Sequence, residues 1–180
     1  MTSPHSFELT IPANATDHSI GPSNARVIVT EYGDFECPNC KQAAPAVKLL
    51  LHRFDGRIRF VYRHFPLEEV HPHALHAAEA AESAGGQGKF WPMHDLLFEN
   101  QPHLRLPQLR DYAERLELDL PRFMAEMKDH VYLQRIRDHI QGGRESGVRA
   151  TPTFYVNREI RDVSFGLSSL FDAVESALRT

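Results

Sequence analysis

The sequence predicts an α/β fold in which a helical segment interrupts a sheet-forming region. Two strand-like segments, at 25–32 and 58–65, flank a helical pattern over 38–54. Residues 71–147 then show helical periodicity without a strand signal, and strand-like residues return at 153–165. The predicted order is therefore β, β-α-β, helical block, β-β-α, which indicates one α/β domain with an all-helical insertion after the second core strand.

The elements of the first half follow from short local patterns. Apolar and polar residues alternate over 7–11, which predicts a short strand, and Gly21-Pro22 predicts a loop over 17–23. The β-branched, nearly continuous apolar run at 25–32 is typical of a strand that is buried on both faces. Pro38 suits the first turn of the next helix, because that turn does not use the N–H that proline lacks. Pro66 ends the second strand.

The second half contains five predicted helices, a hairpin and a final helix. Gly147 marks the end of the helical block, since glycine is common just after a helix. Asn157-Arg158 separates two strand-like runs and predicts a hairpin turn. Ser168 caps a last helix whose apolar residues fall on one face. The helices of the block are predicted at 74–86, 90–98, 107–116, 121–128 and 131–146.

Length and composition predict a globular protein with one insertion. The 180 residues are 42% hydrophobic and 24% charged, which are ordinary globular values. We expect residues 1–66 and 148–180 to form one domain and residues 67–147 to form the inserted helical domain. The net charge of −4 offers no basic field for a nucleic-acid backbone. No apolar run reaches the ~18 residues of a membrane-spanning helix, so we expect neither nucleic acid nor a membrane as partner.

The N-terminus and the two cysteines predict a cytoplasmic protein with a redox or metal site. Residues 1–12 have no basic region and no continuous apolar region, so they do not form a secretory signal, and we expect a cytoplasmic location. Two cysteines are too few for a disulfide scaffold. They are separated by Pro38-Asn39, and this CxxC spacing in a cytosolic protein indicates redox or metal chemistry.

The position of the CxxC predicts a reactive thiolate. Cys37 lies where a strand passes into a helix, and the unpaired N–H groups and dipole of a helix N-terminus favour an anion. We therefore expect a lowered pKa for Cys37, whereas Cys40 lies one turn further in and is shielded. A nucleophilic cysteine with a resolving partner is suited to thiol–disulfide exchange. The neutral Asn39 side chain offers a hydrogen bond to the thiolate, but it adds no positive charge.

Metal binding is the main alternative for these residues. A CxxC is also half of a zinc site, but no second Cys or His pair occurs at ligand spacing. His71, His73 and His76 are most simply polar residues at the start of a helix, with a metal cluster as the alternative. We expect no metal and no organic cofactor.

Several further segments resemble one known family in order and spacing. The chain resembles the DsbA-like thiol:disulfide oxidoreductases of the thioredoxin superfamily over nearly all of its length. The resemblance implies a thioredoxin fold with a helical insertion. The segments that carry it are Asp17–Gly21, Val27–Cys40, Phe65-Pro-Leu67 with His71-Pro72, Gln87–Trp91 with Met93-His-Asp95, and Gly147-Val148 with Ala150-Thr-Pro-Thr-Phe154.

The same resemblance implies roles for residues outside the CxxC. Thr151-Pro152 matches the cis-proline loop that packs against the CxxC and pairs with an extended peptide. Glu31 matches the buried acid beneath the active site, with a raised pKa and a proton to exchange with Cys40. Glu31 also interrupts an apolar run, although an ordinary edge charge is the alternative.

Aromatic residues near these segments are open to two interpretations. Phe35 and Trp91 are candidates for the substrate surface, with core packing as an equal alternative. His94 is expected to be a packing histidine rather than a catalytic base. Together with Phe35, the predicted substrate-binding residues are Pro38, Asn39, Thr151 and Pro152.

The sequence thus predicts a dithiol–disulfide oxidoreductase that acts on protein or peptide thiols. Cys37 attacks, Cys40 resolves the mixed disulfide, and electrons pass to or from an unnamed redox partner or small thiol. Two other functions stay open: a redox-sensing or partner-binding module without turnover, and a glutathione-coupled reductase of small molecules.

Overall fold

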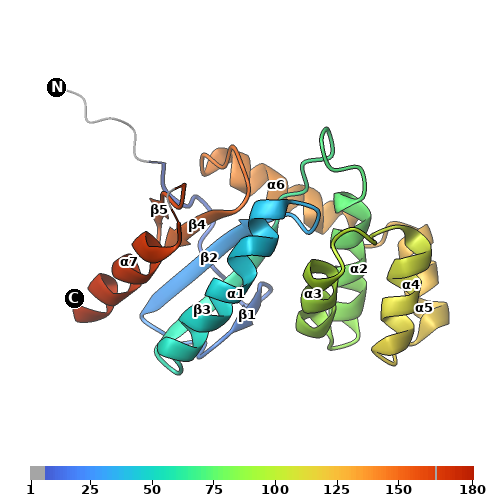
Figure 1. The fold of residues 1–180 in the computed structure, drawn as a ribbon, viewed down its shortest axis with the longest axis horizontal. Helices are drawn as coiled ribbons and strands as arrows, with labels where there is room; N and C mark the ends of the chain where they lie inside the picture. The colour runs from blue at the N-terminus through green and yellow to red at the C-terminus, as the bar shows by residue number, and fades with distance from the viewer. Residues whose placement is uncertain (1–6, 165) are drawn as a thin grey trace. The chain divides into compact units, whose positions relative to one another are not determined.

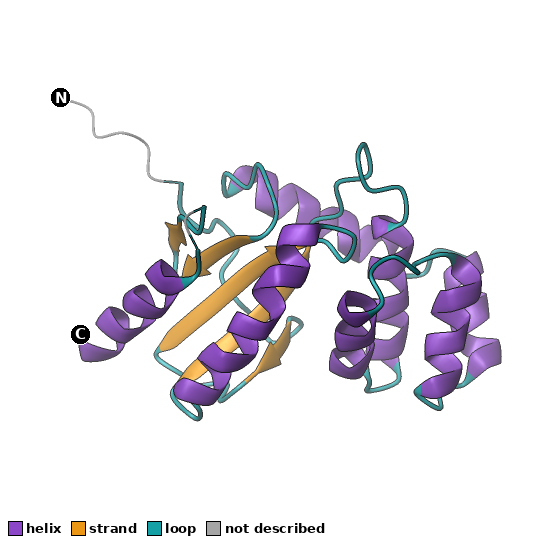
Figure 2. Cartoon of the chain, in the orientation of Figure 1, coloured by secondary structure: helices purple, strands orange, loops and turns teal. Residues whose placement is uncertain are grey.

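The computed structural model describes residues 7–164 and 166–180, whose contacts divide into two units (Figures 1 and 2). The sheet unit contains the described residues up to Gly33 together with Gln42–Arg63 and Gln141–Thr180. The helical unit contains Asp34–Lys41 and His64–Ile140. Both cysteines therefore belong to the helical unit, and the domain boundaries predicted from the sequence stay a prediction.

Five strands form the sheet, in the order β1-β3-β2-β4-β5. The outer pair β1 and β3 is antiparallel, and so are the pairs β2–β4 and β4–β5. β2 and β3 are buried along nearly their whole length, as their continuous apolar sequences predict. The strands are β1 (His18–Ile20), β2 (Val27–Gly33), β3 (Ile58–His64), β4 (Thr153–Val156) and β5 (Glu159–Arg161).

Helices cover the sheet and close the sheet unit. α7 (Ser168–Arg179) packs against β2, β4 and β5. α1 (Pro38–Arg53) buries Leu50 completely, and just after its end the ring of Phe54 lies 6.5 Å from that of Phe171 in α7. This apolar contact joins the two helices, whose backbones Figure 1 shows.

The helical unit is built around α2 (Ala74–Gly86), which contacts α3, α4 and α5. The alanines of α2 are all buried, and their small side chains let neighbouring helices approach closely. A buried carboxylate on the same helix, that of Glu82, contacts two basic side chains. It lies 2.8 Å from His64 Nε2 and 2.9 Å from Arg135 Nε. The other helices of this unit are α3 (Phe90–Glu99), α4 (Leu106–Arg115), α5 (Leu120–Lys128) and most of α6 (Leu133–Glu145).

The end of α6 shows why the chain needs a glycine there. Gly147 has a φ of 90°, a conformation that side chains rarely adopt. Its N–H donates to Arg144 O over 3.1 Å, and Val148 N–H donates to Gly143 O over 2.9 Å. These two bonds close the helix as the sequence predicts.

The structure corrects three local predictions. Ser168 does not cap the last helix but is its first residue, and the N-cap position is Leu167, without a side-chain cap. Residues 7–11 form no strand but a single bridge between Glu8 and Glu159, and the first strand is instead β1, where a loop was expected. The reason lies in β3: Arg63 donates to the Ile11 and Pro12 carbonyls, which a ladder would otherwise use. The last strand ends at Arg161, short of the predicted 165, and residue 165 lies outside the described residues.

Among the described residues, no helix is long and apolar enough to cross a membrane.

Candidate functional site

The two cysteines lie at the start of α1. Cys37 immediately precedes the helix and is 5% exposed, whereas Cys40 lies in its first turn and is fully buried. The N–H of Cys37 donates to Asp34 O over 3.1 Å, and its carbonyl accepts from Lys41 N over 3.2 Å. Cys37 is thus held in a turn that leads directly into the helix.

The electrostatics of this position favour an anion at Cys37. The first turn of α1 contains no acidic residue, and His52 and Arg53 complement the dipole in its last turn. Pro38 and Asn39, between the cysteines, are exposed and uncharged. The helix N-terminus therefore supports a negative charge on the Cys37 sulfur, and the first helical turn adds no acidic side chain against it.

A buried carboxylate that sequence reasoning did not single out organises the segment before Cys37. The Asp34 side chain is fully buried, and its Oδ1 accepts a hydrogen bond from Glu36 N over 2.7 Å. Its Oδ2 accepts from Leu67 N over 2.9 Å and lies 2.7 Å from His71 Nδ1. Asp34 therefore joins the cysteine segment to the start of the chain that follows β3.

Gln101 forms a second anchor of the cysteine segment. It follows the end of α3, and its Nε2 donates to Phe35 O over 2.9 Å and to Cys37 O over 2.8 Å. The two acceptors are the backbone carbonyls of the residues immediately before and after Glu36. One amide group thus fixes the backbone at the point where α1 begins.

Phe35 is a packing residue in this structure. Its ring is 1% exposed, and its centroid lies 5.0 Å from that of Phe98 and 5.6 Å from that of His94. A ring with so little surface offers none to a substrate, so the predicted substrate-binding role of Phe35 gives way to its alternative. His94 packs among the same aromatic rings, as expected.

Glu31 is buried in the middle of the sheet. It is 3% exposed on β2, opposite Phe154 of β4. Because side chains alternate along a strand, Glu31 lies on the same face of β2 as Gly33. On that face, the space beside Gly33 is filled by the Tyr62 ring. The expected burial of Glu31 is confirmed, whereas its place beneath the cysteine helix and its raised pKa stay predictions.

The peptide bond between Thr151 and Pro152 is cis. Thr151 is buried, Pro152 is partly exposed, and β4 begins at the next residue, Thr153. The Thr153 hydroxyl donates to Ala150 O over 2.6 Å and closes the turn around the proline. Contact of Pro152 with the cysteines and a role in substrate binding stay predictions.

Sequence reasoning therefore found the cysteines but not their supports. Asp34 and His71 lay inside segments that carry the family resemblance, and an acid three residues before Cys37 was the available signal. Gln101 had no such signal, because it is 64 residues away from Cys37 in the sequence.

Curated relatives match nearly all of this chain, but the chain matches only part of them. Na(+)/H(+) antiporter NhaA 1 of Salinispora arenicola (strain CNS-205) is 50% identical over 172 residues, which are 95% of this chain and 26% of the antiporter. Na(+)/H(+) antiporter NhaA 1 of Mycobacterium sp. (strain KMS) is 36% identical over 162 residues, 89% of this chain and again 26% of the antiporter. The chain spans about a quarter of the length of the curated relatives it matches.

Solved structures share the fold over almost the whole chain. Oxidised BdbD from Bacillus subtilis has a TM-score of 0.87 at 22% identity and covers 97% of this chain and 98% of its own. A thioredoxin-like oxidoreductase from Silicibacter pomeroyi DSS-3 has a TM-score of 0.79 at 26% identity, covering 93% and 95%. Wolbachia pipientis alpha-DsbA1 has a TM-score of 0.81 at 17% identity, covering 94% of each chain.

A family model described as thioredoxin matches residues 13–176, which include both cysteines, the cis-proline and every strand. This match covers well over half of the chain, and the solved structures named above share its arrangement of sheet and inserted helices. The chain belongs to the thioredoxin family, and its fold is the DsbA-like form.

Proposed function

We propose that the protein is a dithiol–disulfide oxidoreductase that exchanges disulfides with protein or peptide thiols through Cys37 and Cys40. The observation that carries the proposal is the placement of Cys37 directly before α1, with no acidic residue in the first helical turn. A thiolate at a helix N-terminus is the reactive form of a cysteine. The DsbA-like fold supports the same class of activity.

The proposed reaction transfers two electrons in two exchange steps. The Cys37 thiolate attacks one sulfur of a substrate disulfide, so a mixed disulfide forms and the first substrate thiolate leaves. The Cys40 thiolate then attacks the Cys37 sulfur, releases the second substrate thiolate and leaves a Cys37–Cys40 disulfide. The substrate has been reduced and the protein oxidised, and a redox protein or small thiol restores the dithiol.

Cys40 must lose its proton for the second step, and we propose that Glu31 assists. A fully buried thiol ionises reluctantly because burial disfavours its charged form. Glu31 is the acid that the family resemblance matches to this role, and its burial in β2 supports a function other than a solvated edge charge.

The proposed redox potential lies between two reference values. Asn39 offers the Cys37 thiolate a neutral hydrogen bond, so we expect a potential between about −270 mV for thioredoxin and about −120 mV for DsbA. In a reducing cytoplasm, which we propose as the compartment, such a pair rests mainly as the dithiol and works as a reductase. Equilibration with glutathione buffers measures the potential, and a value as high as that of DsbA would contradict both the reductase direction and the compartment.

Reduction of insulin by dithiothreitol tests the activity. The wild-type protein should accelerate insulin precipitation catalytically, whereas Cys37→Ser should be inactive. A Lys41→Gln variant, changed at an exposed residue beside Cys40, serves as the matched control and should retain turnover. A wild-type protein with no effect on insulin would contradict the proposal.

A second function is a redox-sensing module without turnover. The observation in its favour is that relatives named as Na(+)/H(+) antiporters contain a segment up to 50% identical to this chain, in proteins about four times longer. In this function, oxidation of the Cys37–Cys40 pair changes the affinity for a protein partner. A reversible Cys37–Cys40 disulfide together with no activity in the insulin assay would favour this function.

Turnover that requires glutathione and a small disulfide would instead favour the glutathione-coupled reductase.

A further inference from the structure

The segment between β3 and α2 forms a tight turn that is pinned to one carboxylate oxygen. The Leu67 carbonyl accepts from Val70 N over 3.0 Å and from His71 N over 2.8 Å, which closes the turn. Asp34 Oδ2 accepts from Leu67 N over 2.9 Å and lies 2.7 Å from His71 Nδ1. We call residues 67–73 the strap. Both ends of its turn are therefore fixed on a single buried atom.

The strap is attached a second time to the residue before Cys37. His73 N donates to Glu36 Oε2 over 2.7 Å, and Glu36 N donates in turn to Asp34 Oδ1 over 2.7 Å. Asp34 O accepts from Cys37 N. Three hydrogen bonds therefore link the strap to the segment that ends in the nucleophile, all within the helical unit. The strap keeps a fixed position next to the Cys37 backbone.

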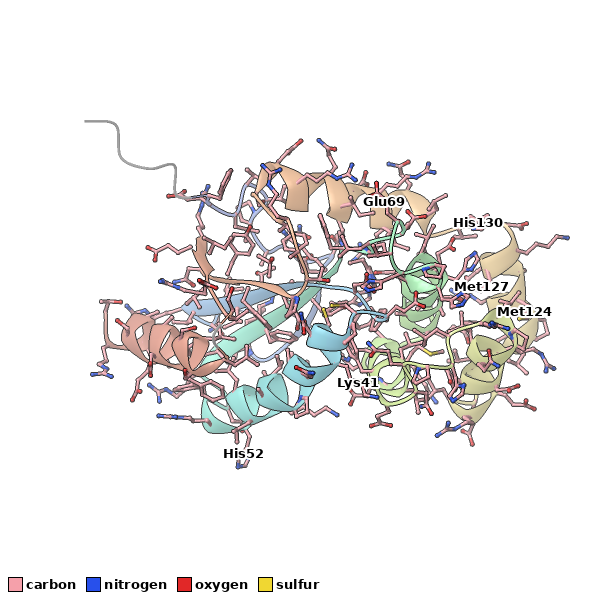
Figure 3. The ribbon with its side chains drawn as sticks, turned by 45° about the horizontal axis from the view of Figure 1, so that its top comes forward. Lys41, His52, Glu69, Met124, Met127 and His130 are labelled. Carbon is pink, nitrogen blue, oxygen red and sulfur yellow. The ribbon has the colours of Figure 1, made fainter. Side chains whose placement is uncertain are left out.

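The outer side of the turn exposes groups that no contact in the fold explains. Val70 is 68% exposed, the largest fraction among the large hydrophobic residues that the structure describes. Glu68 and Glu69 are also exposed, and within residues 7–164 and 166–180 neither forms a salt bridge or a side-chain hydrogen bond. Figure 3 labels Glu69 on this turn, ahead of α2. A single exposed apolar residue is common on protein surfaces, but Val70 lies on a turn that is hydrogen-bonded to the cysteine segment.

We propose that the strap is a docking surface for the substrate, and that it selects extended peptides with lysine or arginine next to the reactive cysteine. The inference rests on the proposed function and names its substrate class. The charge complementarity is local, since two unpaired carboxylates immediately precede the exposed Val70 in the sequence, and global, since the chain carries a net charge of −4. Val70 contacts an apolar side chain of the peptide, and the two carboxylates pair with its cations.

The alternative for this surface is that the two acids only aid solubility. That alternative explains the charge of the two side chains, but it does not explain why partly buried hydrogen bonds hold the turn against the cysteine segment. It also predicts no difference between cationic and anionic peptides beyond what any acidic surface of this protein gives. The two explanations therefore separate in one experiment.

The test compares two peptide disulfides that differ only at the residues flanking the cysteine. One peptide carries two arginines there and the other carries two glutamates. Their reduction is followed at low salt with dithiothreitol as the electron donor. Two exposed ion pairs predict a kcat/KM about fivefold higher for the arginine peptide. Glu68→Gln/Glu69→Gln should reduce that preference to near unity, and added salt should do the same in the wild type. Val70→Ser should raise KM for both peptides.

Matched controls come from the same unit. Glu114→Gln/Glu117→Gln removes two exposed acids at the end of α4, and Val131→Ser changes another exposed valine. Both variants should behave as the wild type. Equal rates for the two peptides, or a preference that survives in Glu68→Gln/Glu69→Gln or falls equally in the α4 control, would overturn the strap proposal. Failure to reduce either peptide would instead overturn the proposed function.

Discussion

Replacing Gln101 should loosen the start of α1, because its amide donates two hydrogen bonds to the Phe35 and Cys37 carbonyls. Gln101→Met keeps the length of the side chain and removes both donors. A hydrogen bond contributes about 1 kcal/mol net, so the variant should lose about 2 kcal/mol of unfolding free energy. For a chain of 180 residues this corresponds to a fall in Tm of about 4–8 °C.

Gln101→Glu separates the hydrogen bonds from simple packing. A carboxylate cannot donate, and it would place a negative charge against two carbonyl oxygens beside Cys37. This variant should be less stable than Gln101→Met, and the pKa of Cys37 should rise because a nearby negative charge disfavours the thiolate. Urea unfolding gives the stability, and the pH dependence of iodoacetamide labelling in a Cys40→Ser background gives the pKa.

The control for this pair is Gln134→Met, which removes an exposed hydrogen bond to Asp138 within α6. It should change stability by less than about 0.5 kcal/mol. If Gln101→Met and Gln101→Glu both match this control in stability and in labelling, Gln101 is not an anchor of the cysteine segment.

Three further predictions follow from buried groups. Burial opposes the charge of Arg63, but its hydrogen bonds to Asp17 raise its pKa above the usual value, so Arg63→Met should cost about 3–5 kcal/mol in urea unfolding. Adding Asp17→Asn should recover part of that loss, and no recovery would refute the pairing argument. Burial and the nearby Tyr32 raise the pKa of Tyr155 to about 12, so its contribution to stability is complete below the unfolded-state pKa of about 10 and disappears as pH rises through about 12. Tyr155→Phe, which loses the bond to Ser146 O, should be about 1 kcal/mol less stable at pH 7, with a difference that shrinks above pH 10; a constant difference would contradict this. Glu31→Gln should slow the resolving step by Cys40 in rapid mixing while the first attack by Cys37 is little changed, and an unchanged resolving rate would make Glu31 structural.

The order of elements was predictable because local patterns decide it. The apolar run of β2, the helix that follows the CxxC and Gly147 after α6 each depend on neighbours within a few residues. The position of Cys37 follows from the same local logic, since a strand that passes into a helix places the first cysteine at a helix N-terminus.

The supports of the site were not predictable because they join residues distant in the chain. Asp34 is 37 residues from His71, and Gln101 is 66 residues from Phe35. No periodicity or spacing records such pairs. The predicted strand at 7–11 failed for a related reason, because the carbonyls of Ile11 and of the next residue, Pro12, bond to the Arg63 side chain rather than to a neighbouring strand. Whether Phe35 packs in the core or faces a substrate also depends on tertiary contacts, since only the packed helical unit shows that its ring is covered.

Trapping of mixed disulfides tests the central claim most directly. Purified Cys40→Ser and Cys37→Ser variants are mixed with oxidised insulin and with a peptide disulfide, and covalent adducts are counted by intact-mass spectrometry. Cys40→Ser should accumulate an adduct at Cys37, because the attacking thiolate is present and the resolving thiol is absent. Cys37→Ser should accumulate none. Adducts on Cys40 alone, or no adduct with either variant, would contradict the account of Cys37 as the nucleophile of a thiol–disulfide exchange.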